Sequence, residues 1–158
     1  MVFIAALRSE YMSKKFRKAS HSVFSLHVHL VWITKYRYSV LTQDIGTRVR
    51  DIIRQECASL DVQIISGVVS RDHVHLFVSY PPKLSVSELV KRLKGRSSRK
   101  IQQEITELRR KYWGRHFWGI GFGAFSSGNV TDEMIEEYIA HHDEHPNHLD
   151  DFKVRPSD

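Results

Sequence analysis

The sequence predicts one α+β domain, in which an antiparallel sheet carries helices on one of its faces. Three observations indicate this class. Short apolar runs are rich in β-branched and aromatic residues, apolar residues recur at helical spacing between those runs, and polar or proline-containing breaks separate the two patterns. The 158 residues, of which 41% are hydrophobic, suit a single domain spanning 1–158, with a core at about 21–145 and looser tails.

The first half of the chain contains three predicted strands and one helix. Segment 23–33 is a long β-branched and aromatic run, which predicts a strand. Thr42 can N-cap an amphipathic helix that ends near Asp61. The apolar runs 62–69 and 73–80 are separated by a polar tripeptide, which indicates a β-hairpin.

In the second half, Ser85 and Glu88 form a capping box that predicts the start of a helix. Gly95 and the serine pair 97–98 predict a break, after which a second helix follows. Segment 117–126 is aromatic with alternating glycines, which favours an irregular strand.

A last helix is predicted to begin at Thr131 or Asp132 and to end before Pro146. The complete order is therefore β-α-β-β-α-(α)-β-α. Its first part is the βαββαβ order of ferredoxin-like and RNA-recognition-motif-like folds, with an added C-terminal helix. In such folds helices cover one face of the sheet and leave the other open.

Charge is distributed unevenly along the chain. The formal net charge is +6, yet residues 83–115 hold eleven Lys/Arg against three Asp/Glu, whereas residues 116–158 hold two against nine. Three carboxylates cannot pair with most of the basic side chains in the first segment. We therefore expect it to bind a polyanion, although a charge run can also be a solvated helix face.

The single cysteine, Cys57, predicts neither an intramolecular disulfide nor a cysteine-based zinc or redox site. The apolar stretch Val2–Leu7 lacks a preceding basic segment and is too short for a signal peptide or a membrane span. These features predict a cytoplasmic protein without membrane association.

Two H-x-H pairs stand in predicted strands. His73 and His75 project from one face of their strand, because side chains alternate, and two imidazoles so placed can hold one metal ion. His27 and His29 have the same spacing in the first strand, and such pairs also arise by chance in a chain with ten histidines. At most one pair needs to be a metal site.

Tyr138 and His142 lie four residues apart and share one face of the predicted last helix. They could supply a phenol and a further imidazole to a site. Alternatively, Tyr138 is a core aromatic and His142 is one of several surface histidines. His141, three residues after Tyr138, competes with His142.

Four motifs in this order resemble the HUH single-tyrosine transposases of the insertion-sequence two-hundred type, over roughly 21–144. The family's HUH motif is two histidines around a hydrophobic residue. The matching segments are His29–Trp32 with Lys35–Arg37 and Val40–Leu41, Asp72–Leu76, Lys94–Arg99, and Phe117–Trp118 followed twenty residues later by Tyr138.

The resemblance implies a transposase that cleaves and rejoins single-stranded DNA at insertion-sequence ends through a covalent 5′-phosphotyrosine. It places Tyr138 on the nucleophile, His73 and His75 on the HUH metal ligands, and His142 on the third ligand. It further implies recognition of DNA hairpins and a homodimer, in which the tyrosine helix serves its own or the partner's metal site.

The resemblance implies Mg²⁺ or Mn²⁺ as cofactor, although imidazole ligands suit transition metals better than Mg²⁺. No small-molecule cofactor is expected, and the sequence has no GxxxxGK[ST] phosphate-binding loop. The side chains that we expect to contact DNA are basic, with one aromatic stacking surface. They are Lys35, Tyr36, Arg37, Lys91, Lys94, Arg96 and Arg99.

Three other functions are alternatives. A domesticated relative could process chromosomal repeat hairpins. A non-catalytic RNA-recognition-like module would stack bases on the sheet, but Phe77 shares its face with His73 and His75, a poor stacking platform. A metal hydrolase would need a general base near the histidines, and alternation along the strand is expected to point Asp72 elsewhere.

Overall fold

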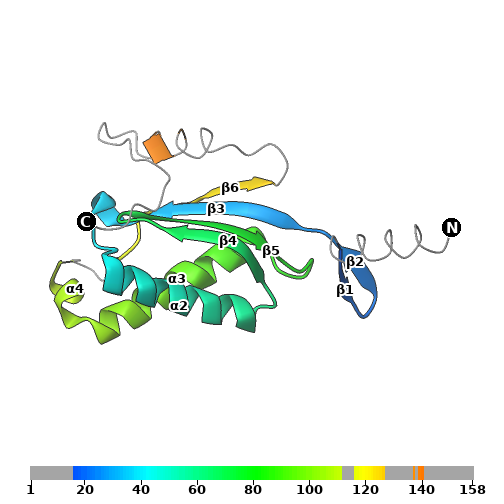
Figure 1. The fold of residues 1–158 in the computed structure, drawn as a ribbon, viewed down its shortest axis with the longest axis horizontal. Coiled ribbons are helices and arrows are strands. Elements are labelled where there is room, and N and C mark those ends of the chain that lie inside the picture. Colours follow the sequence, from blue (N-terminus) through cyan, green and yellow to red (C-terminus); the bar gives the residue numbers. More distant parts are fainter. Residues whose placement is uncertain (1–15, 112–115, 127–136, 138, 141–158) are drawn as a thin grey trace.

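The computed structural model describes residues 16–111, 116–126, 137 and 139–140 (Figure 1). The elements within these residues are strands, helices and one 3₁₀ turn. They are β1 (Arg17–Ala19), β2 (Ser22–Phe24), β3 (His27–Ile33), the 3₁₀ turn η1 (Lys35–Arg37), α2 (Gln43–Ser59), β4 (Gln63–Val69), β5 (His73–Ser79), α3 (Val86–Glu104), α4 (Thr106–Lys111) and β6 (Gly123–Ser126).

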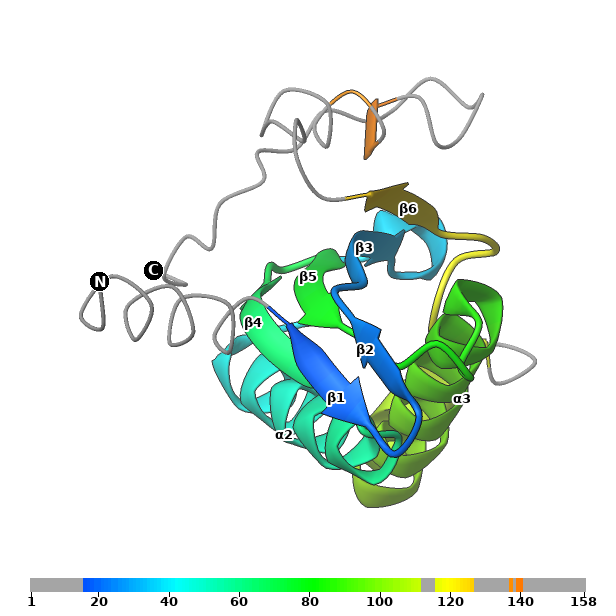
Figure 2. The ribbon, with the colours of Figure 1, turned by 90° about the vertical axis from the view of Figure 1, so that its right-hand side faces the viewer.

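The main sheet has four strands in the order β4-β5-β3-β6, and every neighbouring pair is antiparallel. Helices α2 and α3 lie on one face of this sheet, as the two ribbon views show (Figures 1 and 2). The predicted α+β class and the βαββαβ order from β3 to β6 are confirmed. A separate two-stranded sheet, β1-β2, was not predicted.

The core lies between the sheet and the two helices. Alternate side chains of β3 and β5, among them Leu30, Trp32 and Leu76, pack there against helix residues such as Ile53 and Leu89. Each fully buried aliphatic side chain contributes about 1.5–3 kcal/mol. The same alternation directs the remaining side chains of both strands to the opposite face of the sheet.

Helices α2 and α3 each have an apolar buried stripe and a charged outer face. The predicted capping box is confirmed in part, because the Ser85 hydroxyl accepts a hydrogen bond from the Glu88 backbone N–H at 3.1 Å. Within the described residues, no helix is long and apolar enough to cross a bilayer.

The predicted helix break at Gly95 and the serine pair 97–98 is wrong, since α3 runs unbroken from Val86 to Glu104. Ser97 is fully buried and its hydroxyl donates to the Leu93 carbonyl at 2.6 Å, which satisfies it within the helix. The backbone instead leaves the helical conformation at Ile105, where φ is −121° and ψ is 90°.

The predicted strand over 23–33 is also two strands. β2 ends at Phe24 and pairs with β1, whereas β3 begins at His27 and pairs with β5 and β6. Val23 is 62% exposed. A β-branched run reports strand propensity but not the pairing partner, so the division could not be predicted from composition.

Replacing Ser97 by Ala should lower the free energy of unfolding by about 1–3 kcal/mol, because the buried Trp118 indole N–H, which donates to the Ser97 hydroxyl at 2.9 Å, loses its acceptor. Urea denaturation measures the change. Ser87→Ala, at an exposed position of the same helix, is the control. Equal stability of the two variants would contradict this account.

Candidate active site

The histidines of β3 and β5 lie together on the face of the sheet away from the helices. In the antiparallel register His29 stands opposite Phe77 and Val31 stands opposite His75. Directly paired residues share a face, so His29 and His75 lie on the same side as His73, as predicted for the HUH pair. The apolar residues between them belong to the core.

His73 is held by a buried chain of polar contacts. Its Nδ1 atom lies 2.8 Å from Asp72 Oδ1, and Arg37 donates to Asp72 Oδ2 at 2.9 Å. The Arg37 and Asp72 side chains are each 6% exposed, and His73 is 1% exposed. Because an ionised carboxylate can only accept, Nδ1 of His73 carries a proton and donates it to Asp72.

Asp72 is ionised over the whole physiological range. Burial alone would raise the pKa of its carboxyl, but the hydrogen bond and charge of His73 and the charge of Arg37 outweigh burial and lower the pKa to about 2. The expectation that Asp72 points away from His73 is wrong. Asp72 precedes the first residue of β5, so strand alternation does not govern its side chain.

His75 is neutral at physiological pH. Burial, followed by the charges of His29 and His73, lowers its pKa to about 4. Its Nε2 atom lies 3.1 Å from His29 Nδ1, so one of these nitrogens donates and the other accepts. A metal ligand must be a neutral imidazole, and His75 meets this condition.

His29 contacts His75 across the sheet, a contact that the sequence did not predict. Its ring stacks on Phe77 at a centroid distance of 4.2 Å and lies against His75. Burial lowers its pKa. The sequence did contain a pattern that could have indicated this contact. The two H-x-H pairs lie on strands that are neighbours in a βαββαβ sheet.

Tyr138, His142 and the alternative His141 lie outside the described residues. Of their segment, Glu137 and Ile139–Ala140 are described, and Ile139 is fully buried. These residues lie on the side of the sheet opposite α2 and α3 (Figures 1 and 2). Among the residues that the structure describes, no group of three His, Cys, Asp or Glu side chains could hold a metal ion.

The η1 turn brings predicted DNA contacts next to the histidine face, because it follows Ile33, which pairs with His73. Tyr36 and Arg37 have positive φ values of 57° and 51°, uncommon for residues with side chains. Tyr36 is 69% exposed, with the Lys35 amine 5.1 Å from its ring centroid. Arg37, by contrast, is buried in an ion pair with Asp72.

The four predicted contacts on α3 lie on the other layer of the molecule. Lys94 donates to the Gly119 and Gly121 carbonyls at 2.7 and 2.8 Å, and burial lowers its pKa, so it holds the loop before β6. Arg96 lies 4.0 Å from Glu56 of α2. Lys91 and Arg99 are exposed. Their contact with DNA stays a prediction.

Comparison with known proteins shows similarity to transposases. The sequence profile of the family described as "Transposase IS200 like" matches residues 22–142. The chain is 32% identical over 123 residues to the ISDra2 transposase TnpA of Deinococcus radiodurans, covering 78% of this chain and 88% of that protein. It is 31% identical over 125 residues to the transposase for insertion sequence element IS200 of Salmonella typhimurium, covering 79% and 82%.

Two solved structures are similar in fold. A crystal structure from Deinococcus radiodurans, assigned as a transposase, superposes with a TM-score of 0.72 at 29% identity and covers 78% of this chain and 95% of that one. A REP-associated tyrosine transposase bound to a REP hairpin gives a TM-score of 0.52 at 14% identity, over 75% and 66% of the two chains. The second likeness concerns the fold alone.

Replacing Arg37 by Gln should lower the free energy of unfolding by about 3–5 kcal/mol, because it leaves the Asp72 carboxylate buried without its cation. Urea denaturation measures this loss, and Lys18→Gln, at an exposed lysine, is the control. If Arg37→Gln keeps wild-type stability and instead loses affinity for DNA, Arg37 is a phosphate ligand and not a structural cation.

Proposed function

This chain belongs to the IS200-like transposase family, and we propose that it cleaves and rejoins single-stranded DNA at insertion-sequence ends through a covalent intermediate on Tyr138. The family cleaves DNA and transfers strands. The observation that carries the finer proposal is that His73 and His75 lie on one face of the sheet, with His73 hydrogen-bonded to the buried Asp72 carboxylate.

The residues of this face fit a divalent metal ion. His73 Nδ1 donates a hydrogen bond to the Asp72 carboxylate, an arrangement common behind metal-binding histidines. His73 and His75 would hold Mg²⁺ or Mn²⁺ together with His142, and the ion would polarise the scissile phosphodiester. Imidazole donors favour Mn²⁺ over Mg²⁺.

The chemical step assigned to Tyr138 is an in-line displacement at phosphorus. The phenol oxygen loses its proton and bonds to phosphorus, the bond from phosphorus to the 3′ oxygen breaks, and that oxygen leaves as a 3′-hydroxyl after taking a proton. The product is a 5′-phosphotyrosine. Because this ester keeps the bond energy of the phosphodiester, a 3′-hydroxyl can reverse the step and rejoin a strand without a nucleotide cofactor.

We propose DNA hairpins as the recognised form of the substrate and a homodimer as the active state. The hairpin-bound structure of similar fold supports the first point. For the second, β4 and β6 are the two edge strands of the sheet and offer backbone groups to another chain. Light scattering of the purified protein tests the dimer.

Two alternatives have less support. A repeat-processing nuclease is favoured only by the structure at 14% identity, whereas the higher identity and TM-score belong to the other transposase structure. A base-stacking module would need an open aromatic face, but Phe77 is already covered by the His29 ring. Imperfect palindromes in the DNA flanking the gene would distinguish a mobile element.

Mixing the protein with a labelled single-stranded hairpin and Mn²⁺ should give an SDS-resistant adduct, which Tyr138→Phe should abolish because the attacking oxygen is gone. Gel electrophoresis of the labelled strand measures the adduct. Tyr80→Phe, which removes a phenol elsewhere, should retain it. Persistence of the adduct in Tyr138→Phe would reject Tyr138 as nucleophile.

Replacing Asp72 by Asn should weaken Mn²⁺ binding about 10–100-fold, the usual effect of removing a carboxylate behind a metal-bound histidine. Electron paramagnetic resonance of free Mn²⁺ measures the affinity without reference to catalysis. His73→Ala should weaken it more, since a ligand is lost. Unchanged Mn²⁺ affinity in a folded Asp72→Asn protein would show that Asp72 does not position a metal ligand.

A further inference from the structure

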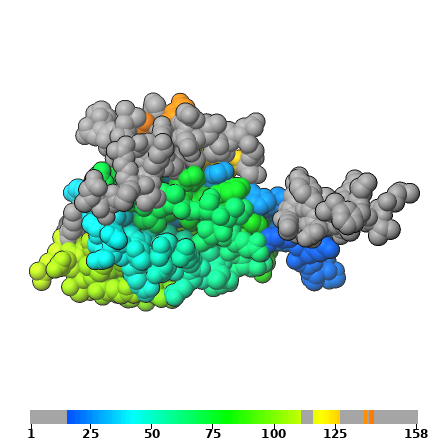
Figure 3. Space-filling model, in the orientation of Figure 1, coloured from blue at the N-terminus to red at the C-terminus, as the bar shows by residue number. Residues whose placement is uncertain are grey.

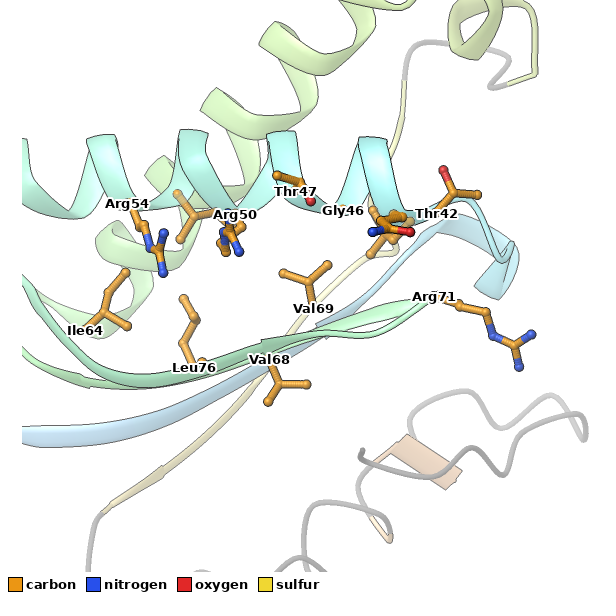
Figure 4. A pocket seen from close by; sticks show the side chains of 14 residues that line it. Thr42, Gly46, Thr47, Arg50, Arg54, Ile64, Val68, Val69, Arg71 and Leu76 are labelled. Carbon is orange, nitrogen blue, oxygen red and sulfur yellow. The ribbon is translucent and has the colours of Figure 1, made fainter. Parts of the chain in front are cut away.

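A groove of about 370 Å³ lies between α2 and the β4–β5 hairpin, on the helix side of the sheet (Figure 4). Its size falls within the range of about 300–1,000 Å³ typical of pockets for small ligands. α2 and β4 lie side by side on the face of the molecule shown in Figure 3. The floor is apolar and includes Ile53, Ile64, Val69 and Leu76.

The lining of the groove is strongly cationic. It includes three arginines, Arg50, Arg54 and Arg71, and no carboxylate. Asp51 lies behind two of them, 3.4 Å from Arg50 and 3.9 Å from Arg54, and so offsets one charge at most. Among the described residues the Arg71 guanidinium has no ion-pair partner. An anion therefore fits this lining.

Two glycines keep the groove open. A Cβ at Gly67 of β4 would come within 2.8 Å of Leu76 Cδ2, and one at Gly46 of α2 would lie 3.5 Å from Val69 Cγ1. A larger side chain at either position would fill the space between the helix and the hairpin. The polar side chains of Thr42 and Thr47 also line the groove and can hydrogen-bond a ligand.

The groove leads toward the histidine face. Arg71 stands at its end and points away from α2 (Figure 4), and Asp72 and His73 follow it directly in the chain. A single strand that lies in the groove can therefore pass around the β4–β5 turn to the phosphodiester cleaved on the other side of the sheet.

We propose that this groove binds one nucleotide of the single-stranded substrate, with its base on the apolar floor and adjacent phosphates on the three arginines. This inference rests on the proposed function and extends its DNA-binding surface to residues outside the predicted contacts. Arginine forks match phosphate oxygens in geometry and charge, and an apolar floor accepts a base of any sequence.

The test is equilibrium binding of a fluorescein-labelled single strand of about 12 nucleotides, within the usual site size of single-strand binders, at several salt concentrations without metal. Arg54→Gln should weaken binding several-fold and lower the salt slope by about 0.7, the value for one phosphate contact. Thr47→Trp fills the groove without changing charge, and should weaken binding about tenfold, because it displaces the base from the apolar floor.

Arg48→Gln is the matched control, because it makes the same charge change on the same helix outside the groove, where Arg48 donates twice to Glu104 at 2.7 Å. Its affinity should equal that of the wild type. An equal loss in Arg48→Gln and Arg54→Gln would overturn the proposal, since net charge alone would explain both.

If light scattering shows that Thr47→Trp dissociates an oligomer while DNA affinity is unchanged, the groove receives a second copy of the chain and the proposal is wrong. A different result would contradict the proposed function, namely an SDS-resistant adduct that persists in Tyr138→Phe. The binding measurement uses no metal and no cleavage, so the two failures can be distinguished.

Discussion

Seven residue pairs join β3 to β5, from His27 opposite Ser79 to Ile33 opposite His73. This register places Leu30, Trp32 and Leu76 in the core and every histidine of both strands on the face of the sheet away from the helices. A slip by one residue would exchange the two faces, burying imidazoles against the helices and exposing the apolar core. Because that exchange would cost free energy of folding, the register keeps the candidate site on the face of the sheet away from the helices.

The buried ion pair between Arg37 and Asp72 connects the turn after β3 to the start of β5. A buried pair of this kind is costly to desolvate and is not in itself a source of stability. Here the same carboxylate also accepts a hydrogen bond from His73. Asp72 therefore both anchors the turn after β3, through Arg37, and orients the His73 ring. The Thr34 backbone N–H supports the same turn through the Asp72 carbonyl at 2.8 Å.

The two layers of the molecule differ in charge. The face of the sheet away from the helices carries the histidines, while the helix layer carries most of the described cations. Some of these cations are paired, as Arg92 and Arg96 are with Glu56. The β4–β5 turn, with Arg71 beside Asp72, is where these sides meet.

The sequence by itself determined the βαββαβ order from β3 to β6, the α+β class and the placement of His73 and His75 on one face, because periods of 2 and 3.6 residues are local properties of the chain. Its motifs also indicated the transposase family. Only the tertiary structure decided that α3 continues through Ser97, that Arg37 pairs with Asp72, and that His29 contacts His75. These outcomes depend on partners that are distant in the sequence: the Trp118 indole, a carboxylate 35 residues away and a neighbouring strand. Local spacing carries no information about which distant groups a fold brings together.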